Sequence, residues 1–274
     1  MYYPVSPGNN VYENPQAKID YSNINEGYII VETGLDKADN RSWKIEEKKG
    51  DEKVIFDVFD RQEVIPLIFG DGEYMFRIMK QTVANPTLYS PAMFVALEHR
   101  ARENNIRLRY PNQRVNYTEK SAAVLKAAEI CRQNRTEAER MIKIYDFIYS
   151  EFTYDTNFAN VVKPGYLPNC DRTLLRKSGI CCDIAELFAV MCRSQGMLCK
   201  YVTGYVKVPD RNEPLYHAYN RVWVGNEMLL PCGVHIKARN WEIVDPTFGM
   251  SGGGQPLVAK WIDTDSNYSD KHSY

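Results

Sequence analysis

Hydrophobic and polar residues alternate along the first part of the chain. Residues 53–59 alternate at period two, which is typical of a half-buried strand. The apolar stretches 63–69 and 74–79 flank a Gly-Asp-Gly turn, which predicts a β-hairpin. Short strands separated by turns predict a β-sandwich of immunoglobulin-like outline over residues 19–115.

The composition of this first part predicts a binding or spacer module rather than a reaction site. Residues 1–18 are rich in Pro, Asn, Gly and Tyr and predict an extended leader. The β-module at 19–115 contains one histidine, His99, and no predicted acid–base cluster. A third segment, residues 116–274, is predicted to be a separate domain, because the periodicity changes there.

The pattern of the third segment favours helices first and strands afterwards. Apolar residues recur at helical spacing over 118–133, and a capping box at Thr136 opens a second helix. A short helix is expected at 172–177, and the helix at 181–195 is apolar on nearly all sides, which predicts a central position. The expected strands are residues 200–208, 218–224, 228–230 and 241–244. The fold class is therefore α+β, with a central helix on an antiparallel sheet.

Composition and charge limit the kinds of binding partner that the sequence predicts. A net charge of −1 does not predict binding to nucleic acid, and no apolar run reaches the roughly 18 residues needed to span a bilayer. The seven cysteines match no zinc pattern, and no calcium loop is present, so no cofactor and no metal are predicted. The first residues lack a signal-peptide pattern, which leaves two expectations: a cytoplasmic protein, or one whose signal or anchor is absent from this chain.

Two adjacent cysteines, Cys181 and Cys182, follow Gly179 where the central helix is expected to begin. Free N–H groups and the helix dipole favour a thiolate there, and the Cys181 amide is a candidate oxyanion donor. Helical spacing turns Cys181 toward the interior and Cys182 toward solvent, which favours Cys181 as the nucleophile. The alternative is a buried helix that merely contains two small residues.

A base and an acid follow in chain order. His217 begins a predicted strand, whereas His272 lies in a polar tail. Asp245 ends a predicted strand before a proline, and a partly buried carboxylate there would accept Nδ1–H from a histidine. Cysteine, histidine and acid together form a candidate triad. The alternatives are a structural histidine and an aspartate that caps a turn.

Five blocks of the chain, in order, resemble the transglutaminase-like superfamily over about residues 120–248. The blocks are residues 179–185, 193–197, 202–205, 216–219 and 245–248. The resemblance assigns the catalytic cysteine, histidine and acid to Cys181, His217 and Asp245. It departs at Tyr219, where a tryptophan is usual, and at Cys182. Tyr219 is expected to line the cleft, and Tyr166 is a candidate oxyanion donor.

The resemblance implies acyl transfer on protein or peptide carboxamides through a thioester, leading to crosslinking, deamidation or peptide hydrolysis. The layout is similar to secreted or surface-attached proteins of Gram-positive bacteria, which implies an extracellular, cell-wall-associated substrate. Two alternatives stay open. One is a papain-like cysteine protease, although such enzymes usually carry Asn where Asp245 stands. The other is a non-catalytic surface module that binds peptide or cell-wall polymer.

Overall fold

The computed structural model describes residues 2–274 except 35–40, 209–211, 252–255 and 263. It divides into two compact units, Tyr2–Gln113 and Arg114–Tyr274. The division falls two residues before the boundary expected from the sequence. Among the described residues, no helix has the length and the apolar content needed to cross a bilayer.

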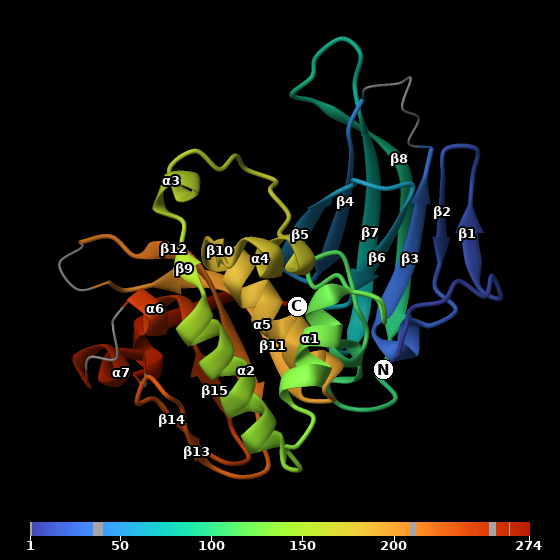
Figure 1. The fold of residues 1–274 in the computed structure, drawn as a ribbon. Coiled ribbons are helices and arrows are strands. Elements are labelled where there is room, and N and C mark those ends of the chain that lie inside the picture. Colours follow the sequence, from blue (N-terminus) through green and yellow to red (C-terminus); the bar gives the residue numbers. More distant parts are fainter. Residues whose placement is uncertain (1, 35–40, 209–211, 252–255, 263) are drawn as a thin grey trace. The chain divides into compact units, whose positions relative to one another are not determined.

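The first unit consists of two four-stranded antiparallel sheets (Figure 1). Its strands are β1 (Val11–Glu13), β2 (Ala17–Asp20), β3 (Tyr28–Thr33), β4 (Trp43–Lys49), β5 (Glu52–Asp57), β6 (Gln62–Pro66), β7 (Gly72–Gln81) and β8 (Tyr89–His99). The strand orders are β1-β2-β3-β6 and β5-β4-β7-β8. Alternation along β7 buries Tyr74, Phe76 and Ile78, which form part of the core of this unit. The immunoglobulin-like outline stays a prediction.

Two sequence expectations for this unit are wrong. The Gly-Asp-Gly segment does not close a hairpin, because β6 pairs with β3 whereas β7 pairs with β4 and β8. A local turn pattern does not specify which strands pair, and here it connects two different sheets. The predicted leader is also partly a sheet: β1 pairs with β2, with Tyr12 opposite Ile19.

The second unit is α+β, as the sequence predicts. Its helices are α1 (Ala122–Ile130), α2 (Glu137–Glu151), α3 (Thr156–Ala159), α4 (Cys170–Arg176), α5 (Cys181–Ser194), α6 (Pro246–Ser251) and α7 (Pro256–Ile262). Its strands are β9 (Thr153–Tyr154), β10 (Ser178–Gly179), β11 (Leu198–Val206), β12 (Leu215–Trp223), β13 (Met228–Leu229), β14 (His235–Ile236), β15 (Trp241–Val244) and β16 (Tyr268–Ser273). The capping box at Thr136 is confirmed, since its side chain accepts from the Glu139 N–H at 3.2 Å while Glu139 accepts from the Thr136 N–H.

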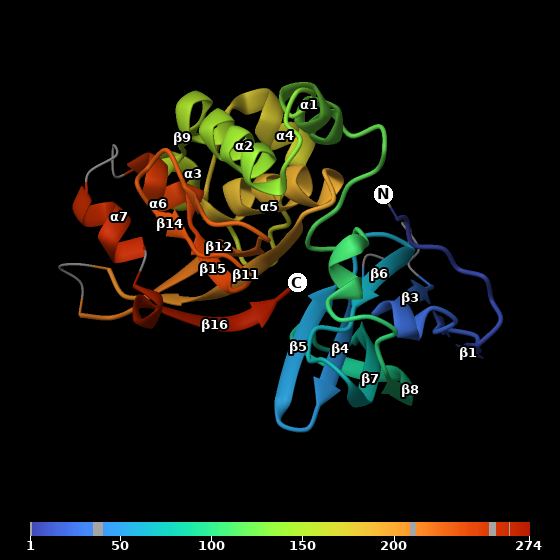
Figure 2. The same cartoon turned by 90° about the horizontal axis from the view of Figure 1, so that it is seen from below.

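Helix α5 lies between α1, α2 and α4 on one side and the antiparallel sheet β15-β12-β11-β16 on the other (Figure 2). Every residue from Asp183 to Ser194 is buried, which confirms the expected central position. Asn220 ties the helix to the sheet, because its fully buried amide donates to the carbonyls of Ala185 and Lys200. The segment expected to be a polar tail is strand β16, which pairs with β11.

Candidate active site

The first turn of α5 is held from two sides. Strand β10 pairs in parallel with β9, with Gly179 opposite Tyr154. Asp183 accepts the N–H of Ile180, the residue before the helix, at 3.0 Å. A Cβ on Gly179 would lie 2.6 Å from the Cβ of Asp183. Close packing against Asp183 therefore explains this glycine, because its φ is not positive.

Cys181 is the first residue of α5 and Cys182 the second. Both are half-buried, so the expected difference in exposure is wrong. The reason is that the face of Cys182 is also covered: Glu186, Ala189 and Arg193 are all buried. Burial and the charge of Cys181 raise the pKa of the Cys182 thiol well above its usual range. Cys182 is thus disfavoured as a thiolate.

His217 lies on β12 and Asp245 directly after β15, and the fold brings them into contact. His217 Nε2 is 2.8 Å from Asp245 Oδ2, and both side chains are buried (3% and 1% exposed). Cys181 lies close enough to His217 to interact with it and to raise its pKa. Since Nε2 faces Asp245, Nδ1 is the ring nitrogen left for the thiol. The expectation of an Nδ1–H bond to the carboxylate is therefore wrong.

The charge on His217 is set by its two neighbours. Burial lowers its pKa, but the charge and hydrogen bond of Asp245 and the interaction with Cys181 outweigh that effect and raise it to about 10. His217 is consequently an imidazolium near neutral pH, and it lies beside Cys181. Such a charge, together with the free N–H groups at the start of α5, stabilises a thiolate.

Asp245 is held through both of its carboxylate oxygens. Oδ1 accepts the Phe248 N–H at 3.0 Å, from the first turn of α6. Oδ2, which also faces His217, accepts the hydroxyl of Tyr268 at 3.0 Å. The sequence predicts neither of these donors.

Tyr166 and Tyr219, the two tyrosines predicted at the site, donate their hydroxyls to aspartates other than Asp245. The Tyr166 hydroxyl donates to Asp183 Oδ1 at 2.6 Å, so the structure does not aim it at Cys181. Tyr219 is fully buried and stacks behind His217, with ring centroids 6.1 Å apart, while its hydroxyl donates to Asp270 at 2.6 Å. Tyr219 therefore supports His217 and does not line an open cleft.

Tyr154 is the tyrosine at this site that the sequence analysis missed. Its backbone pairs with Gly179, two residues before Cys181. Partial burial, then the charges of Cys181, Cys182 and Asp183, raise its pKa to about 12. Tyr154 is 37% exposed, so it is accessible to solvent. The signal in the sequence is weak, because a tyrosine 27 residues before the cysteine forms no motif by itself.

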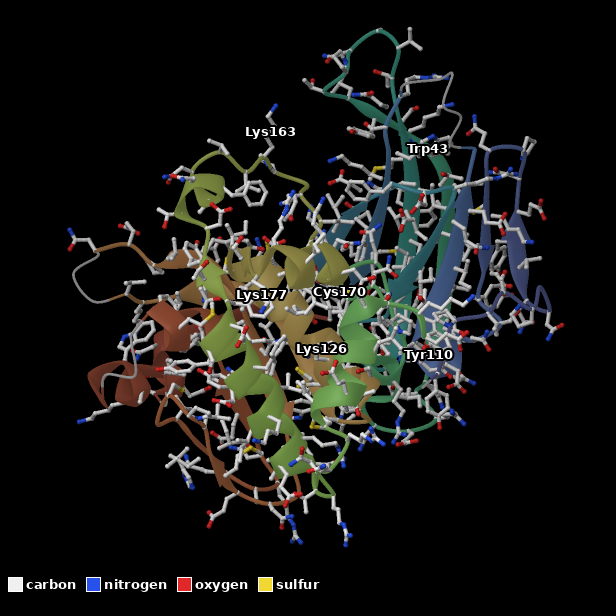
Figure 3. The ribbon with its side chains drawn as sticks, in the orientation of Figure 1. Trp43, Tyr110, Lys126, Lys163, Cys170 and Lys177 are labelled. Atoms are coloured by element: carbon white, nitrogen blue, oxygen red, sulfur yellow. The ribbon has the colours of Figure 1, made fainter. Side chains whose placement is uncertain are left out.

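The loop between α3 and α4 runs beside the first turn of α5. Lys163 extends outward from this loop (Figure 3). Tyr166 turns back from it toward Asp183 and also contacts Arg172 at 3.1 Å. The loop therefore holds the first turn of α5 through Tyr166 and presents the cationic side chain of Lys163 to solvent.

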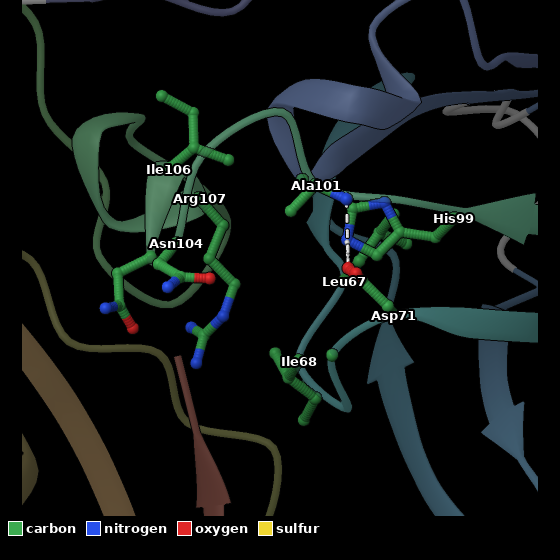
Figure 4. Close-up of a pocket in the computed structure, with 11 residues that line it drawn as sticks. Leu67, Ile68, Asp71, His99, Ala101, Asn104, Ile106 and Arg107 are labelled. Atoms are coloured by element: carbon green, nitrogen blue, oxygen red, sulfur yellow. Dashed lines mark hydrogen bonds and ion pairs between the residues drawn. The ribbon is translucent and has the colours of Figure 1, made fainter.

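A separate hollow of about 490 Å³ lies in the first unit (Figure 4). Its lining includes His99 and Asp71, whose Nε2 and Oδ1 are 3.8 Å apart, and Arg107. Burial lowers the pKa of His99, and the nearby buried Glu47 has its pKa raised by burial to about 8. The hollow contains none of the predicted triad residues. In the ranges that the structure describes, no group of three or more His, Cys, Asp or Glu side chains could hold a metal ion.

The second unit is thus an α+β domain with a candidate cysteine-dependent active site, in which a buried histidine–aspartate pair lies near a cysteine at a helix N-terminus. Residues 126–246 match the family model of the transglutaminase-like superfamily. This segment is therefore similar to the transglutaminase-like superfamily. The match supports a cysteine-dependent enzymatic role, although the superfamily also includes non-catalytic members. None of the curated proteins matches the chain.

Solved structures offer weaker likenesses. A candidate cysteine protease from Cytophaga hutchinsonii is 15% identical, with a TM-score of 0.45, covering 97% of this chain and 73% of that one. The periplasmic domain of TgpA from Pseudomonas aeruginosa is 14% identical, with a TM-score of 0.40, covering 77% and 91%. Red sea bream transglutaminase is 12% identical, with a TM-score of 0.32, covering 83% and 49%. Likenesses with TM-scores below 0.5 do not establish a shared activity.

Proposed function

We propose that Cys181, His217 and Asp245 form a triad for acyl transfer on protein or peptide carboxamides through a thioester. The observation that carries the proposal is the buried contact of His217 Nε2 with Asp245 at 2.8 Å, with Cys181 near enough to the same imidazole to raise its pKa. A histidine held in one orientation by a carboxylate, with its other nitrogen toward a thiol, is the arrangement that general-base activation requires.

In the first step, Cys181 Sγ attacks the carboxamide carbon as a thiolate. His217, protonated beside it, gives its Nδ1 proton to the leaving ammonia or amine, and the C–N bond breaks to leave a thioester. In the second step, water or a lysine amine attacks the thioester, and His217 takes the proton of that nucleophile. Cys181 leaves as a thiolate, which restores the starting state. Asp245 holds Nε2–H throughout and stabilises the imidazolium.

The negative oxygen of each tetrahedral intermediate needs donors. The N–H of Cys181 lies at the start of α5, where helix N–H groups have no intrahelical partner. The Tyr154 hydroxyl is the second donor in this proposal. Its partial exposure and its electrostatic response to Cys181 support the role, which the sequence had given to Tyr166.

The pH dependence of iodoacetamide alkylation, with peptide mapping, tests the site. Cys181 in the wild type is expected to react rapidly below about pH 7, in contrast to a free thiol with its pKa near 8.5. His217→Ala should abolish this fast reaction, whereas His235→Ala, an exposed histidine of the same unit, should leave it unchanged. Cys182→Ala is the matched thiol control. Reaction of wild-type Cys181 at an ordinary rate, indifferent to His217, would overturn the proposal and favour the non-catalytic binding module.

The second nucleophile can be identified with a glutamine-containing peptide and a labelled primary amine. Ammonia release with amine incorporation indicates crosslinking, and ammonia release alone indicates deamidation. New peptide termini indicate hydrolysis of the chain, as in a cysteine protease. Each product should disappear in Cys181→Ala and persist in Cys182→Ala.

The proposed setting is extracellular, with a substrate at the bacterial surface or cell wall. This part rests on the sequence resemblance alone. Fractionation of the source cells tests it, because detection of the protein only in the cytoplasm would overturn it.

A further inference from the structure

Strand β16 lies one strand away from β12, yet it contributes side chains to the surroundings of His217. On the intervening strand β11, Gly204 pairs with His217 on one side and with Asp270 on the other. Tyr268 pairs with Val206, two residues along β11. Residues paired directly across antiparallel strands lie on the same face. Tyr268 and Asp270 therefore share the face of His217.

Gly204 makes this approach possible. A Cβ there would lie only 2.2 Å from the Ser269 carbonyl oxygen and 3.1 Å from the Asp270 Cα. A bulge between Thr203 and Gly204 shifts the register at the same place. The absence of a side chain at this position leaves room for β16 beside β11, opposite His217 on β12.

Two buried tyrosines use this space, and each donates to a different carboxylate. The Tyr268 hydroxyl donates to Asp245 Oδ2 at 3.0 Å, and the Tyr219 hydroxyl donates to Asp270 Oδ1 at 2.6 Å. Their rings meet edge to face with centroids 4.8 Å apart. Asp270 is also bound by Arg221 at 2.7 Å. The chain thus contains a matched pair of tyrosines, of which only Tyr268 touches Asp245.

We propose that Tyr268 is a positioning residue for the proposed reaction, whose hydroxyl fixes the Asp245 carboxylate and draws part of its charge away from His217. The proposal rests on the function proposed above. Tyr268 and His217 Nε2 share one oxygen, Oδ2, so each donor weakens the hold of the carboxylate on the other. The hydroxyl stays a donor across the working pH range, because burial and the Asp245 charge raise the pKa of Tyr268.

Removal of the hydroxyl should leave Asp245 in place but more strongly coupled to His217. The Phe248 N–H still holds Oδ1, and Oδ2 has lost the donor that competed with the imidazole. The carboxylate charge then stabilises the imidazolium more, and the pKa of His217 rises. Loss of Tyr219 has no such effect, because its hydroxyl donates to Asp270.

Other titratable groups lie around the His217–Asp245 pair. They are Cys181 from α5, Tyr145 from α2, Tyr219 from β12 and Tyr268 itself from β16. The pKa of each of these tyrosines is raised, chiefly by burial, so the tyrosines stay neutral while His217 titrates. Cys181 is the group that would interfere, and Cys181→Ala removes it.

The test is an NMR titration of ¹³C-labelled histidine, for which the chain has only four residues to resolve. The proteins are full-length Cys181→Ala, alone and combined with Tyr268→Phe or with Tyr219→Phe. We expect Tyr268→Phe to raise the pKa of His217 by about 0.5 to 1 and Tyr219→Phe to leave it unchanged. An equal effect of the two substitutions, or no effect of either, would overturn the proposal.

The experiments distinguish a failure of the proposed acyl-transfer function from a failure of the positioning role of Tyr268. The titration requires no turnover, so it reports on Tyr268 even if wild-type Cys181 alkylates as an ordinary thiol. If Tyr268→Phe does not fold, site-specific Tyr268→3-fluorotyrosine keeps the ring and makes the hydroxyl a stronger donor. That variant should lower the pKa of His217, and an unchanged or higher value would refute the role.

Discussion

Gly204→Ala is expected to destabilise the Arg114–Tyr274 unit and to disturb the site without changing any residue of the proposed triad. The added Cβ would meet the Ser269 carbonyl oxygen at 2.2 Å and the Asp270 Cα at 3.1 Å. Both are backbone atoms of β16, so no side chain can rotate away. Either β16 moves off β11 and takes Tyr268 away from Asp245, or β11 bends away from β12.

The magnitude follows from two opposing effects. Overpacking of this kind costs about 1–3 kcal/mol, and contact with backbone atoms places Gly204 near the upper end. Alanine also restricts the unfolded chain, which returns about 0.4–1 kcal/mol. The net loss is therefore about 2 kcal/mol, or about 4–8 °C in Tm for a unit of this size.

Tryptophan fluorescence during thermal and urea unfolding measures the loss, since Trp223, Trp241 and Trp261 all lie in this unit and only Trp43 lies in the other. Gly225→Ala is the matched control, because a Cβ at Gly225 meets nothing within 4 Å. We expect Gly225→Ala to be neutral or slightly stabilising. Equal stability of the two variants would refute the reasoning that β16 is held tightly against β11.

Three further outcomes are expected. The pKa of His217 is raised in the folded protein, so its ion pair with Asp245 stabilises the fold fully below the unfolded pKa near 6.5, and this stabilisation is lost as pH rises through about 10. Urea unfolding at pH 7 and at pH 10.5 should therefore show a larger drop in unfolding free energy for wild type than for His217→Gln. Phe188→Ala in α5 should cost about 3–5 kcal/mol of unfolding free energy, because the ring is fully buried. Tyr154→Phe should slow acyl transfer about 10²-fold, as loss of an oxyanion donor does, whereas Tyr166→Phe should leave the rate nearly unchanged; the opposite ranking would restore Tyr166 as the donor.

The sequence was most informative about the second unit, where local signals are strong. The apolar residues of α5 predict a central helix from Cys181, and the observed helix begins there. The strand expected at 200–208 is β11 at Leu198–Val206, and the strand expected at 241–244 is β15 with those bounds. Periodic burial and capping residues act over one helix or strand, so they are visible in a short stretch of sequence.

Contacts between distant segments could not be read in this way. The segment 268–273 has polar residues at most positions and predicts no strand, yet it pairs with β11 because Gly204 admits it. For the same reason Tyr268 gave no signal as a partner of Asp245. The choice of His217 Nε2 rather than Nδ1 depends on how two strands meet, and no local pattern contains that information. The hairpin expected at Gly70–Gly72 failed for a related cause, since turn residues specify a bend but not the partner strand.

The choice between the two adjacent cysteines rests in the structure on other reasons than in the sequence. Helical spacing favours Cys181 by assuming that Cys182 turns toward solvent, but both thiols are half-buried. Two other effects separate them. His217 stays cationic beside Cys181, whereas burial raises the pKa of Cys182 and keeps it a neutral thiol. In the proposed triad, selectivity between the neighbouring thiols therefore depends on the charge that each one meets, and the strand that carries His217 supplies that charge to Cys181.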